Sequence, residues 1–402
     1  MIVFLYSVAF VDAIRKGRQI CENDVIHASR SESASKAVLM MIYSPSKYIA
    51  SKARFILSQI LKPNGKEYLK HLLHFLNYTT SGFNIGLPYI FQTIINLVGL
   101  TCYLGLPQYQ RYVSGSEVMK TLLAFVRWCW SNPLPIKRQS VAPHLYNKFS
   151  ERTCCWINRE WEGEDVRLLY GLWAVAELVH HFYSVSSDKL NNMEAQLFSL
   201  LQEICIRTTA DGPRWFAAYI LSHFGFYGFL SKIGKRIGKA LYMEEFADVQ
   251  LILATGKALS VHGVVLAIRC PPLLPPGNDK TSNNSSMGDD TEKLSGNFRK
   301  TVRFSTHVDG QALQTLLDFV YFGYLEGEEE LVKRLKPLAK SCNLQPLSLL
   351  LYRKRPNWGT PIPNCDFALG LGPVGHQFSY GLLLSLLKIE VALDQYVVLF
   401  LF

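Results

Sequence analysis

The sequence lacks the residue patterns that mark most enzymes and metal sites. Its nine cysteines form no Cys-x-x-Cys pair, and its ten histidines have no carboxylate or thiol at ligand spacing, which argues against a zinc site. It also has no Gly-rich phosphate loop and no paired nucleophile and base. We therefore expect a protein that is not an enzyme and that needs no cofactor or metal.

Charged residues are also scarce, at 18% of the chain against 49% hydrophobic residues. The net charge of +10 would suit an acidic partner, but most basic residues stand singly between apolar ones, as on a solvated helix face. The densest basic cluster, Lys232, Lys235, Arg236 and Lys239, has no aromatic platform beside it. The sequence therefore disfavours nucleic-acid binding.

One long stretch without charge raises the question of a membrane span. No Asp, Glu, Lys or Arg occurs from His71 to Gln110, and Leu87–Leu106 has about the length that crosses a bilayer. However, Pro88 and Pro107 interrupt this stretch, and several amide side chains lie within or beside it. Because unpaired amides are costly in hydrocarbon, we interpret the stretch as buried helices rather than as a spanning helix.

The cysteines and the amino-terminal residues bear on the cellular compartment. The cysteines are odd in number and mostly lie inside apolar runs, which predicts buried free thiols in a reducing environment. Met1–Phe10 is apolar but lacks the basic flank and the cleavage site of a signal peptide. Together these features predict a cytoplasmic or nuclear location. The cysteines are Cys21, Cys102, Cys129, Cys154, Cys155, Cys205, Cys270, Cys342 and Cys365.

Residues 1–230 are expected to form one helix after another. Within the helix predicted from Ser116 onward, for example, Val118, Leu122 and Phe125 recur at three- and four-residue spacing and form one apolar stripe. Because short loops separate such helices and no strand pattern intervenes, the region is predicted to be an armadillo-like α-solenoid. No sequence repeat can be written down, and a compact helical bundle is the alternative. The predicted helices are Ser46–Leu61, Glu67–Leu76, Ser116–Trp130, Val166–Tyr183 and Met193–Ile206.

A different pattern begins near Glu245. Phe246–Leu253 alternates as a strand, turns through Ala254-Thr-Gly-Lys257 and pairs with a second strand that starts at Ala258, after which a short apolar helix follows. The order of three motifs resembles the BTB/POZ domain, a protein-interaction module with no chemistry of its own. The motifs are Asp248-Val-x-Leu, Val261-His-x-x-Val-Leu-Ala-x-Arg269 and Leu316-Leu-Asp-Phe-Val-Tyr-x-Gly323.

The resemblance implies the domain organisation and the fold class. A BTB/POZ domain over residues 231–352, behind a helical region, is similar to plant BTB/POZ-domain proteins with armadillo-like amino-terminal regions. The implied fold is mainly α with a smaller α+β module. The residues that carry the motif are Asp248, His262, Arg269, Tyr321 and Gly323.

One motif position departs from the family. In many BTB domains an acid at the position of Asp248 faces a basic residue just after the matched histidine, but here Gly263 follows His262. The charged pocket that some members use to contact co-repressors is therefore in doubt. Because a buried carboxylate without a partner is costly, we expect Asp248 to be hydrogen-bonded to the backbone or solvated.

A short amphipathic helix precedes the first strand, with Ile233, Ile237 and Leu241 at four-residue spacing and basic residues between them. This position resembles the first BTB helix, which contributes to the homodimer interface in that family. We therefore expect these three side chains to lie in a dimer interface. The alternative is that the stripe packs against the helical region around Trp215–Phe229.

Two segments are not expected to belong to the folded domains. Residues 271–300 begin with paired prolines and continue as a polar Asn- and Ser-rich run, which predicts a disordered insertion. Residues 353–402 are expected to be a linker followed by an atypical apolar tail. In the plant group a second BTB domain follows the first, and it would begin here near Gly375–Ser379. The segment is therefore the truncated start of such a domain, or its last stretch, Tyr380–Phe402, is an amphipathic helix that needs a partner or non-native sequence.

The family resemblance implies a protein-binding adaptor, with substrate recruitment to a cullin-3 ubiquitin ligase as the default role. Cullin-3-binding members usually carry a hydrophobic-x-Glu element before the third strand, whereas this chain has Phe298-Arg-Lys300 there, without the acid. Pro271 and Pro272 also disrupt the helix that normally follows the Arg-Ser-x-x-Phe motif. The alternative is a dimerising scaffold or a transcription-linked assembly protein that binds no cullin.

Overall fold

The computed structural model describes residues 41–42, 47–61, 65–80, 87–113, 116–133, 163, 165–182, 194–208, 210–274, 300–305 and 308–354. These residues divide into two compact units. The helical unit contains the described residues up to Phe229 together with 325–329 and 349–354, and the mixed unit contains the other described residues from Leu230 to Ser348. The domain boundaries 1–230, 231–352 and 353–402 stay predictions.

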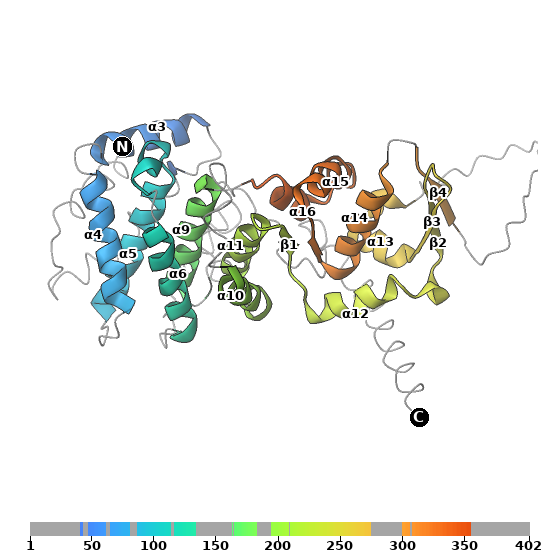
Figure 1. Ribbon diagram of the computed structural model, residues 1–402, viewed down its shortest axis with the longest axis horizontal. Helices are drawn as coiled ribbons and strands as arrows, with labels where there is room; N and C mark the ends of the chain where they lie inside the picture. Colours follow the sequence, from blue (N-terminus) through green and yellow to red (C-terminus); the bar gives the residue numbers. More distant parts are fainter. Residues whose placement is uncertain are drawn as a thin grey trace, which may run out of the picture. The chain divides into compact units, whose positions relative to one another are not determined.

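The helical unit is built from helices that pack on their neighbours (Figure 1). α4 packs on α5 and α6, both of these pack on α9, and α11 packs on α9 and α10. This progression is the one expected when stacked helices share a continuous core. The elements are α3 (Lys47–Leu61), α4 (Gly65–Thr80), α5 (Leu87–Leu104), η2 (Pro107–Tyr112), α6 (Ser116–Ser131), α9 (Val166–Phe182), α10 (Glu194–Arg207), α11 (Asp211–Ser222) and β1 (Phe226–Gly228).

All five helices predicted for this region are present, within a few residues of the expected ends. The apolar stripe of α6 is buried as predicted, because Val118, Leu122 and Phe125 are all less than 5% exposed. α5, which lies within the charge-free stretch, is an 18-residue helix. Among the described residues, no helix combines the length and the apolar character that a bilayer span requires.

α9 lies at the centre of the helical unit, and most of its side chains are buried, which explains why it is apolar around its whole circumference. Trp173 of this helix stacks on Phe216 of α11, with ring centroids 5.0 Å apart. At its first turn the buried Arg167 forms an ion pair of 2.7 Å with Asp165 and donates a hydrogen bond of 3.0 Å to the Asn132 carbonyl oxygen. The buried charge is therefore paired on two sides.

Residues far along the chain complete the helical unit. β5 (Tyr324–Glu326) pairs with β1, and the Gly327 amide donates a hydrogen bond of 3.0 Å to the Gly225 carbonyl oxygen. The Tyr219 hydroxyl donates to the Arg353 carbonyl oxygen at 3.1 Å. A division of the sequence into two contiguous domains near residue 230 does not predict these contacts.

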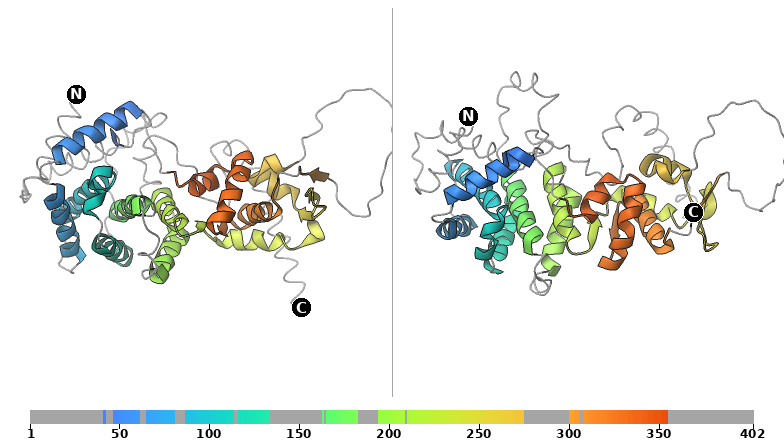
Figure 2. Two further views of the ribbon diagram at one scale, coloured as in Figure 1. Left: turned by 45° about the horizontal axis from the view of Figure 1, so that its top comes forward. Right: turned by 90° about the horizontal axis from the view of Figure 1, so that it is seen from above.

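The mixed unit contains a three-stranded sheet and several helices (Figure 2). In the sheet, β2 is central: β3 pairs with it antiparallel, with Val249 opposite Val261, and β4 pairs with it parallel. The predicted hairpin is thus confirmed. The elements are α12 (Lys232–Ala240), η6 (Glu244–Phe246), β2 (Val249–Ile252), β3 (Ala258–Val261), α13 (Gly263–Arg269), η7 (Pro271–Leu273), β4 (Lys300–Arg303), α14 (Gly310–Phe322), α15 (Glu329–Ser341) and α16 (Gln345–Leu351), the last two of which extend into residues assigned to the helical unit.

α14 is the core helix of the mixed unit. Leu316, Leu317 and Tyr321 are fully buried, and Phe319 is 5% exposed, as the motif predicted. Instead of a second full helix after α13, the prolines at 271 and 272 form the single 3-10 turn η7, because proline lacks the amide that an α-helix needs. The fold is mainly α with a small α+β unit.

Candidate protein-interaction surface

The motif histidine and tyrosine meet inside the mixed unit. The Tyr321 hydroxyl accepts a hydrogen bond of 2.8 Å from the backbone amide of His262 and lies 3.1 Å from the Nδ1 atom of the same residue. Burial lowers the pKa of His262, although the nearby Asp248 opposes this shift, and burial raises the pKa of Tyr321. Both side chains are therefore neutral near pH 7, and the hydroxyl can accept from the amide while donating to Nδ1.

The Asp248 carboxylate is hydrogen-bonded to the backbone, as expected. Its Oδ1 atom accepts a hydrogen bond of 2.5 Å from the Gly263 amide at the first residue of α13. A β-carbon added to Gly263 would lie 2.9 Å from Asp248 Oδ2. Glycine therefore lets the carboxylate approach the helix start, where the exposed amides favour a negative charge. The acid thus has a backbone partner in place of the basic side chain that the family resemblance implies.

Arg269 and Gly323 lie at the carboxyl end of α14 and stabilise it. The buried Arg269 guanidinium donates hydrogen bonds to the carbonyl oxygens of Val320 and of Tyr321, the latter at 2.8 Å. These carbonyls belong to the last turn of α14, whose C-cap is Gly323 with a left-handed φ of 71°. A cation near a helix carboxyl end and a glycine in this conformation both stabilise the end of a helix.

The structure thus brings Asp248, His262, Arg269, Tyr321 and Gly323 into one part of the mixed unit. They join β2, β3, α13 and α14 through hydrogen bonds. Buried polar groups that are satisfied in this way specify one arrangement of the elements around them. The side chains of His262, Arg269 and Tyr321 are all less than 10% exposed.

α12 packs on α14 through its glycines. A β-carbon on Gly234 would lie 2.2 Å from the Phe322 carbonyl oxygen, and one on Gly238 would lie 2.1 Å from the Phe322 ring. The two glycines are therefore the face of the helix that the mixed unit covers. Of the predicted interface residues, Ile237 and Leu241 are half-buried. Ile233 also belongs to α12, but its side chain is outside the described residues.

Directly after α12 the chain exposes three large apolar side chains that the motif comparison did not single out. Tyr242 is 70% exposed, Phe246 is 55% exposed and Met243 is 43% exposed. Together with Ile237 and Leu241 they form what we call the α12 surface. The sequence signal was present, since large apolar residues flank a pair of glutamates, but exposure cannot be read from that pattern.

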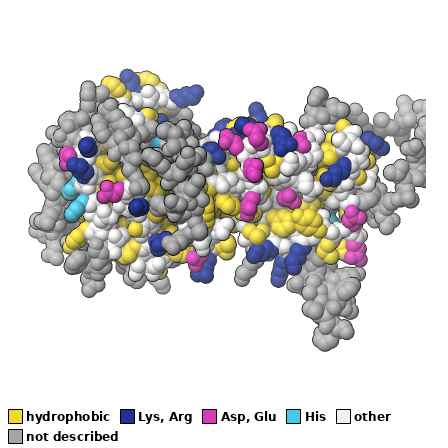
Figure 3. Space-filling model, in the orientation of Figure 1, with side chains coloured by type: hydrophobic (Ala, Val, Ile, Leu, Met, Phe, Trp, Pro, Cys, Tyr) yellow, Lys and Arg dark blue, Asp and Glu magenta, His cyan; other side chains and the backbone are white. Residues whose placement is uncertain are grey.

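The α12 surface is bordered by charges of both signs. Lys235, Arg236 and Lys239 are exposed along the helix, and Glu244 and Glu245 are exposed at its end. Figure 3 shows hydrophobic side chains gathered along this part of the mixed unit, with Lys and Arg side chains below them. An exposed apolar group with a charged rim is the composition of a protein-binding surface.

Tyr242 is anchored at one edge of this surface. Its hydroxyl is hydrogen-bonded to the carboxylate of Asp318, and its ring lies 6.2 Å from the Phe322 ring. Burial raises the pKa of Asp318, although hydrogen bonds from Gln314 and Tyr242 oppose the shift. The ring is thus held in place by α14 while most of its area faces solvent.

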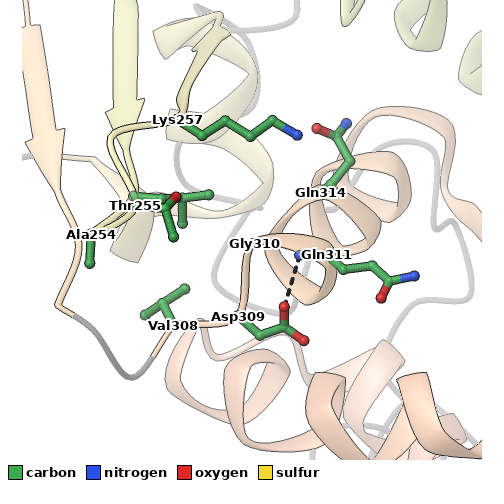
Figure 4. A pocket seen from close by; sticks show the side chains of 9 residues that line it. Ala254, Thr255, Lys257, Val308, Asp309, Gly310, Gln311 and Gln314 are labelled. Carbon is green, nitrogen blue, oxygen red and sulfur yellow. Dashed lines mark hydrogen bonds between the residues drawn. The ribbon is translucent and has the colours of Figure 1, made fainter.

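A hollow lies between the β2–β3 turn and the start of α14 (Figure 4). It has a volume of about 400 Å³. The Lys257 side chain points toward Gln314 in this hollow, and the Asp309 carboxylate accepts a hydrogen bond of 3.0 Å from the Gln311 amide. Asp309 is the N-cap residue of α14, and its carboxylate also forms an ion pair of 2.7 Å with Arg334.

A comparison with known proteins identifies a plant relative of this chain. A BTB/POZ domain-containing protein of Arabidopsis thaliana is 44% identical to it over 378 residues, which are 92% of this chain and 37% of that protein. The chain is related to a plant BTB/POZ protein. This finding confirms the resemblance drawn from the three sequence motifs. No family model matches the chain, and no solved structure matches it.

Two other BTB-related predictions fall largely outside the described residues. The insertion predicted at 271–300 is described only at Pro271–Leu274 and at Lys300, which opens β4. Phe298 and Arg299, which stand in place of the cullin-binding element, are not among the described residues. The tail predicted for 353–402 is described only to residue 354.

The cysteines in the described part of the chain are all buried. Five cysteines lie there, at positions 102, 129, 205, 270 and 342, and all are buried free thiols. The prediction of buried thiols is confirmed for these five. No group of three or more His, Cys, Asp or Glu residues with the geometry of a metal site occurs among the described residues.

Proposed function

We propose that this chain is part of a protein-interaction adaptor and that its mixed unit self-associates through the α12 surface. The observation that carries the proposal is the contrast between the covered glycines of α12 and the exposed apolar residues that directly follow the helix. Gly234 and Gly238 are covered by Phe322, whereas Tyr242, Met243 and Phe246 stay exposed. Large apolar side chains that are exposed close together in this way are typical of an interaction surface.

The charges around the α12 surface favour a second copy as the occupant. A basic helix carrying Lys235, Arg236 and Lys239 runs directly into the acidic pair Glu244 and Glu245. In a two-fold interface the same patch occurs on both subunits, so the basic part of one patch can face the acidic part of the other. The similarity to a BTB/POZ domain-containing protein also supports this role.

We further propose that the helical unit binds a client and that the whole protein recruits the client to a cullin-3 ubiquitin ligase. The ligase role depends on the family resemblance alone, because the hydrophobic-x-Glu element is missing from the sequence. The second candidate is a scaffold, including a transcription-linked one, that dimerises without a cullin. The chain spans 37% of its relative's length, and the rest of such a protein could contribute to either activity. We expect a cytoplasmic or nuclear location, which buried free thiols support.

The self-association proposal is tested by sedimentation equilibrium of the full chain over a concentration series. We expect a monomer–dimer equilibrium, and we expect Ile237→Glu to weaken it at least tenfold because a carboxylate would be desolvated in the interface. The matched control is Ile206→Glu, since Ile206 is 50% exposed on α10 in the helical unit. A monomer at every concentration, or equal weakening by both variants, contradicts the proposal.

The ligase role needs a separate experiment. Purified full chain is mixed with the amino-terminal domain of cullin-3, and the complex is measured by calorimetry. Saturable binding supports the ligase adaptor. A dimeric chain with no detectable cullin binding supports the scaffold instead.

A further inference from the structure

α3 presents an aromatic and basic stripe on the side that faces away from the core. Leu57 is 6% exposed and lies on the inner side of the helix. On the opposite side Tyr48 is 72% exposed and Phe55 is 60% exposed, with the exposed Lys52 between them. These three side chains are four and three residues apart, so they follow one line along the helix. We call them the α3 stripe, and Ile49, which is 46% exposed, lies beside it.

The helical unit holds α3 in place from its inner side. The Tyr109 hydroxyl of η2 donates a hydrogen bond of 3.0 Å to the Ser58 carbonyl oxygen, and the Tyr109 ring stacks on Tyr103 of α5 with ring centroids 4.6 Å apart. Figures 1 and 2 show α3 lying across the ends of α4 and α5. The α3 stripe is therefore presented to solvent by a helix whose backbone is tied to buried residues.

Within the stripe, a ring and an ammonium already interact. The Lys52 Nζ atom lies 5.9 Å from the centre of the Tyr48 ring, which is at the outer limit of a cation–π contact. Such a contact at an exposed site is weak, so it orients the two side chains without neutralising the ammonium. Lys52 therefore presents its charge to solvent between two aromatic rings.

The charge of α3 is entirely basic. The helix contains Lys47, Lys52 and Arg54 and no Asp or Glu. Lys47 and Lys52 are exposed, whereas Arg54 is half-buried. The next acid along the sequence, Glu67 in the first turn of α4, forms an ion pair of 2.9 Å with Lys70. A partner that complements the outer side of α3 is therefore acidic as well as apolar.

The arrangement favours an acidic peptide over an anionic membrane. Binding to an anionic membrane surface typically uses clusters of about 4–8 basic residues, and only two of the three basic residues of α3 are exposed. Because Lys52 lies between the two rings, burying both rings in a bilayer would also bring its ammonium toward the hydrocarbon. A peptide carboxylate can instead pair with the ammonium while apolar side chains beside it cover the rings.

We propose that the α3 stripe binds an acidic amphipathic helix of a protein partner. Such a helix carries an Asp or Glu between two large apolar side chains at three- or four-residue spacing, which matches the order of ring, ammonium and ring on α3. The inference rests on the proposed binding of a client by the helical unit, and it names the chemistry of the client segment.

The test begins with a phage-displayed library of random peptides selected on the immobilised full chain, with the Lys52→Glu variant used for counter-selection. We expect the surviving peptides to have a net negative charge and apolar residues at helical spacing. The leading peptide is then labelled and titrated with the full chain by fluorescence anisotropy. We expect Lys52→Glu and Phe55→Ser each to weaken its binding at least tenfold.

Charge reversal of the peptide gives a measurement that does not depend on any variant. A second peptide carries Lys in place of each acid and keeps the same apolar residues. We expect the wild-type chain to bind it at least tenfold more weakly than the original peptide. We expect Lys52→Glu to bind it more tightly than the wild-type chain does. Equal binding of both peptides by the wild-type chain overturns the proposal.

Two control variants separate the α3 stripe from the rest of the surface. Lys120→Glu changes an exposed lysine on α6, and Tyr78→Ser changes a tyrosine on α4 that is 46% exposed. Neither should alter the affinity for the leading peptide. Peptides that bind the wild-type chain and both α3 variants equally would leave client binding by the helical unit intact and overturn only the α3 site.

The same variants test the membrane alternative. Vesicles of phosphatidylcholine with phosphatidylserine are sedimented with the wild-type chain and with Lys52→Glu. We expect the two proteins to sediment with the vesicles to the same extent. Vesicle binding that Lys52→Glu abolishes, or selected peptides that are neutral or basic, would overturn the proposal of an acidic protein partner.

Discussion

Gly263 shows how one residue changes the chemistry of a family motif. The resemblance implies a basic side chain at this position, facing the acid at 248. Here the acid accepts a hydrogen bond from the Gly263 amide instead, and a β-carbon at 263 would lie 2.9 Å and 3.1 Å from its two carboxylate oxygens. Restoring the family's side chain should therefore harm the fold of this protein.

We predict that Gly263→Lys lowers the free energy of unfolding of the mixed unit by about 1–3 kcal/mol. The added side chain must displace the Asp248 carboxylate or move α13, because its β-carbon meets carboxylate oxygens and the Val249 side chain. Urea denaturation followed by circular dichroism measures the change. Ala267→Lys is the control, since Ala267 is exposed on the same helix. Equal stability of the two variants contradicts the role assigned to Gly263.

His223 gives a prediction about pH. It is 2% exposed in the helical unit. Burial, followed by the charges of Arg353 and His180, lowers its pKa from 6.5 to about 3. Below pH 6.5 the unfolded chain therefore binds a proton that the folded chain does not. The free energy of unfolding should fall as the pH falls from 6.5 toward 3, by up to about 1.4 kcal/mol per pH unit from this group alone.

The measurement is the melting temperature of the full chain between pH 7 and pH 4. We expect His223→Gln, which cannot gain a proton, to show a smaller loss over this range than the wild-type chain. His74→Gln, at an exposed position on α4, should follow the wild-type curve. Parallel curves for all three proteins would mean that His223 does not contribute to the acid sensitivity.

At the scale of elements, α12 shows what a sequence pattern can and cannot predict. The four-residue spacing of Ile233, Ile237 and Leu241 correctly predicted a helix before the first strand. It did not reveal that Gly234 and Gly238 form the covered face, because that depends on Phe322, which is distant in the sequence. The hairpin and α14 were easier to predict, since their strand alternation, turn glycine and apolar run are local signals.

For the covered glycines of α12, we predict that alanine substitution changes the stability in the direction opposite to that expected from helix propensity. Replacing glycine by alanine inside a solvated helix usually stabilises it by about 1 kcal/mol. Gly238→Ala should instead destabilise the mixed unit, because its β-carbon would lie 2.1 Å from the Phe322 ring. Thermal unfolding of the full chain measures the effect.

The control for this prediction is Lys239→Ala on the exposed side of the same helix. That change also introduces alanine but meets no packed ring, so we expect it to be neutral or slightly stabilising. An increase in melting temperature for Gly238→Ala would contradict the packing of α12 on α14.

At the scale of the whole molecule, the sequence predicted a helical region followed by a small α+β domain, and both are present. It did not predict that residues 325–329 and 349–354 belong to the helical unit. β1 and β5 contain three residues each, which is too short for alternation to be recognised. The contact of Tyr219 with the Arg353 carbonyl also has no local signal. The motif residues were found from the sequence, whereas their hydrogen-bonded arrangement and the exposure of Tyr242 required the structure.

The central claim is that the α12 surface binds a second copy of the chain. Site-specific photocrosslinking tests it directly, with p-benzoylphenylalanine in place of Tyr242, which is 70% exposed. The same replacement at Tyr48, which is 72% exposed on α3, is the control. We predict a covalent dimer from position 242 and none from position 48, with the crosslinked peptides mapping to residues near α12. The absence of a dimer from position 242, or equal dimer yields from both positions, would contradict the account.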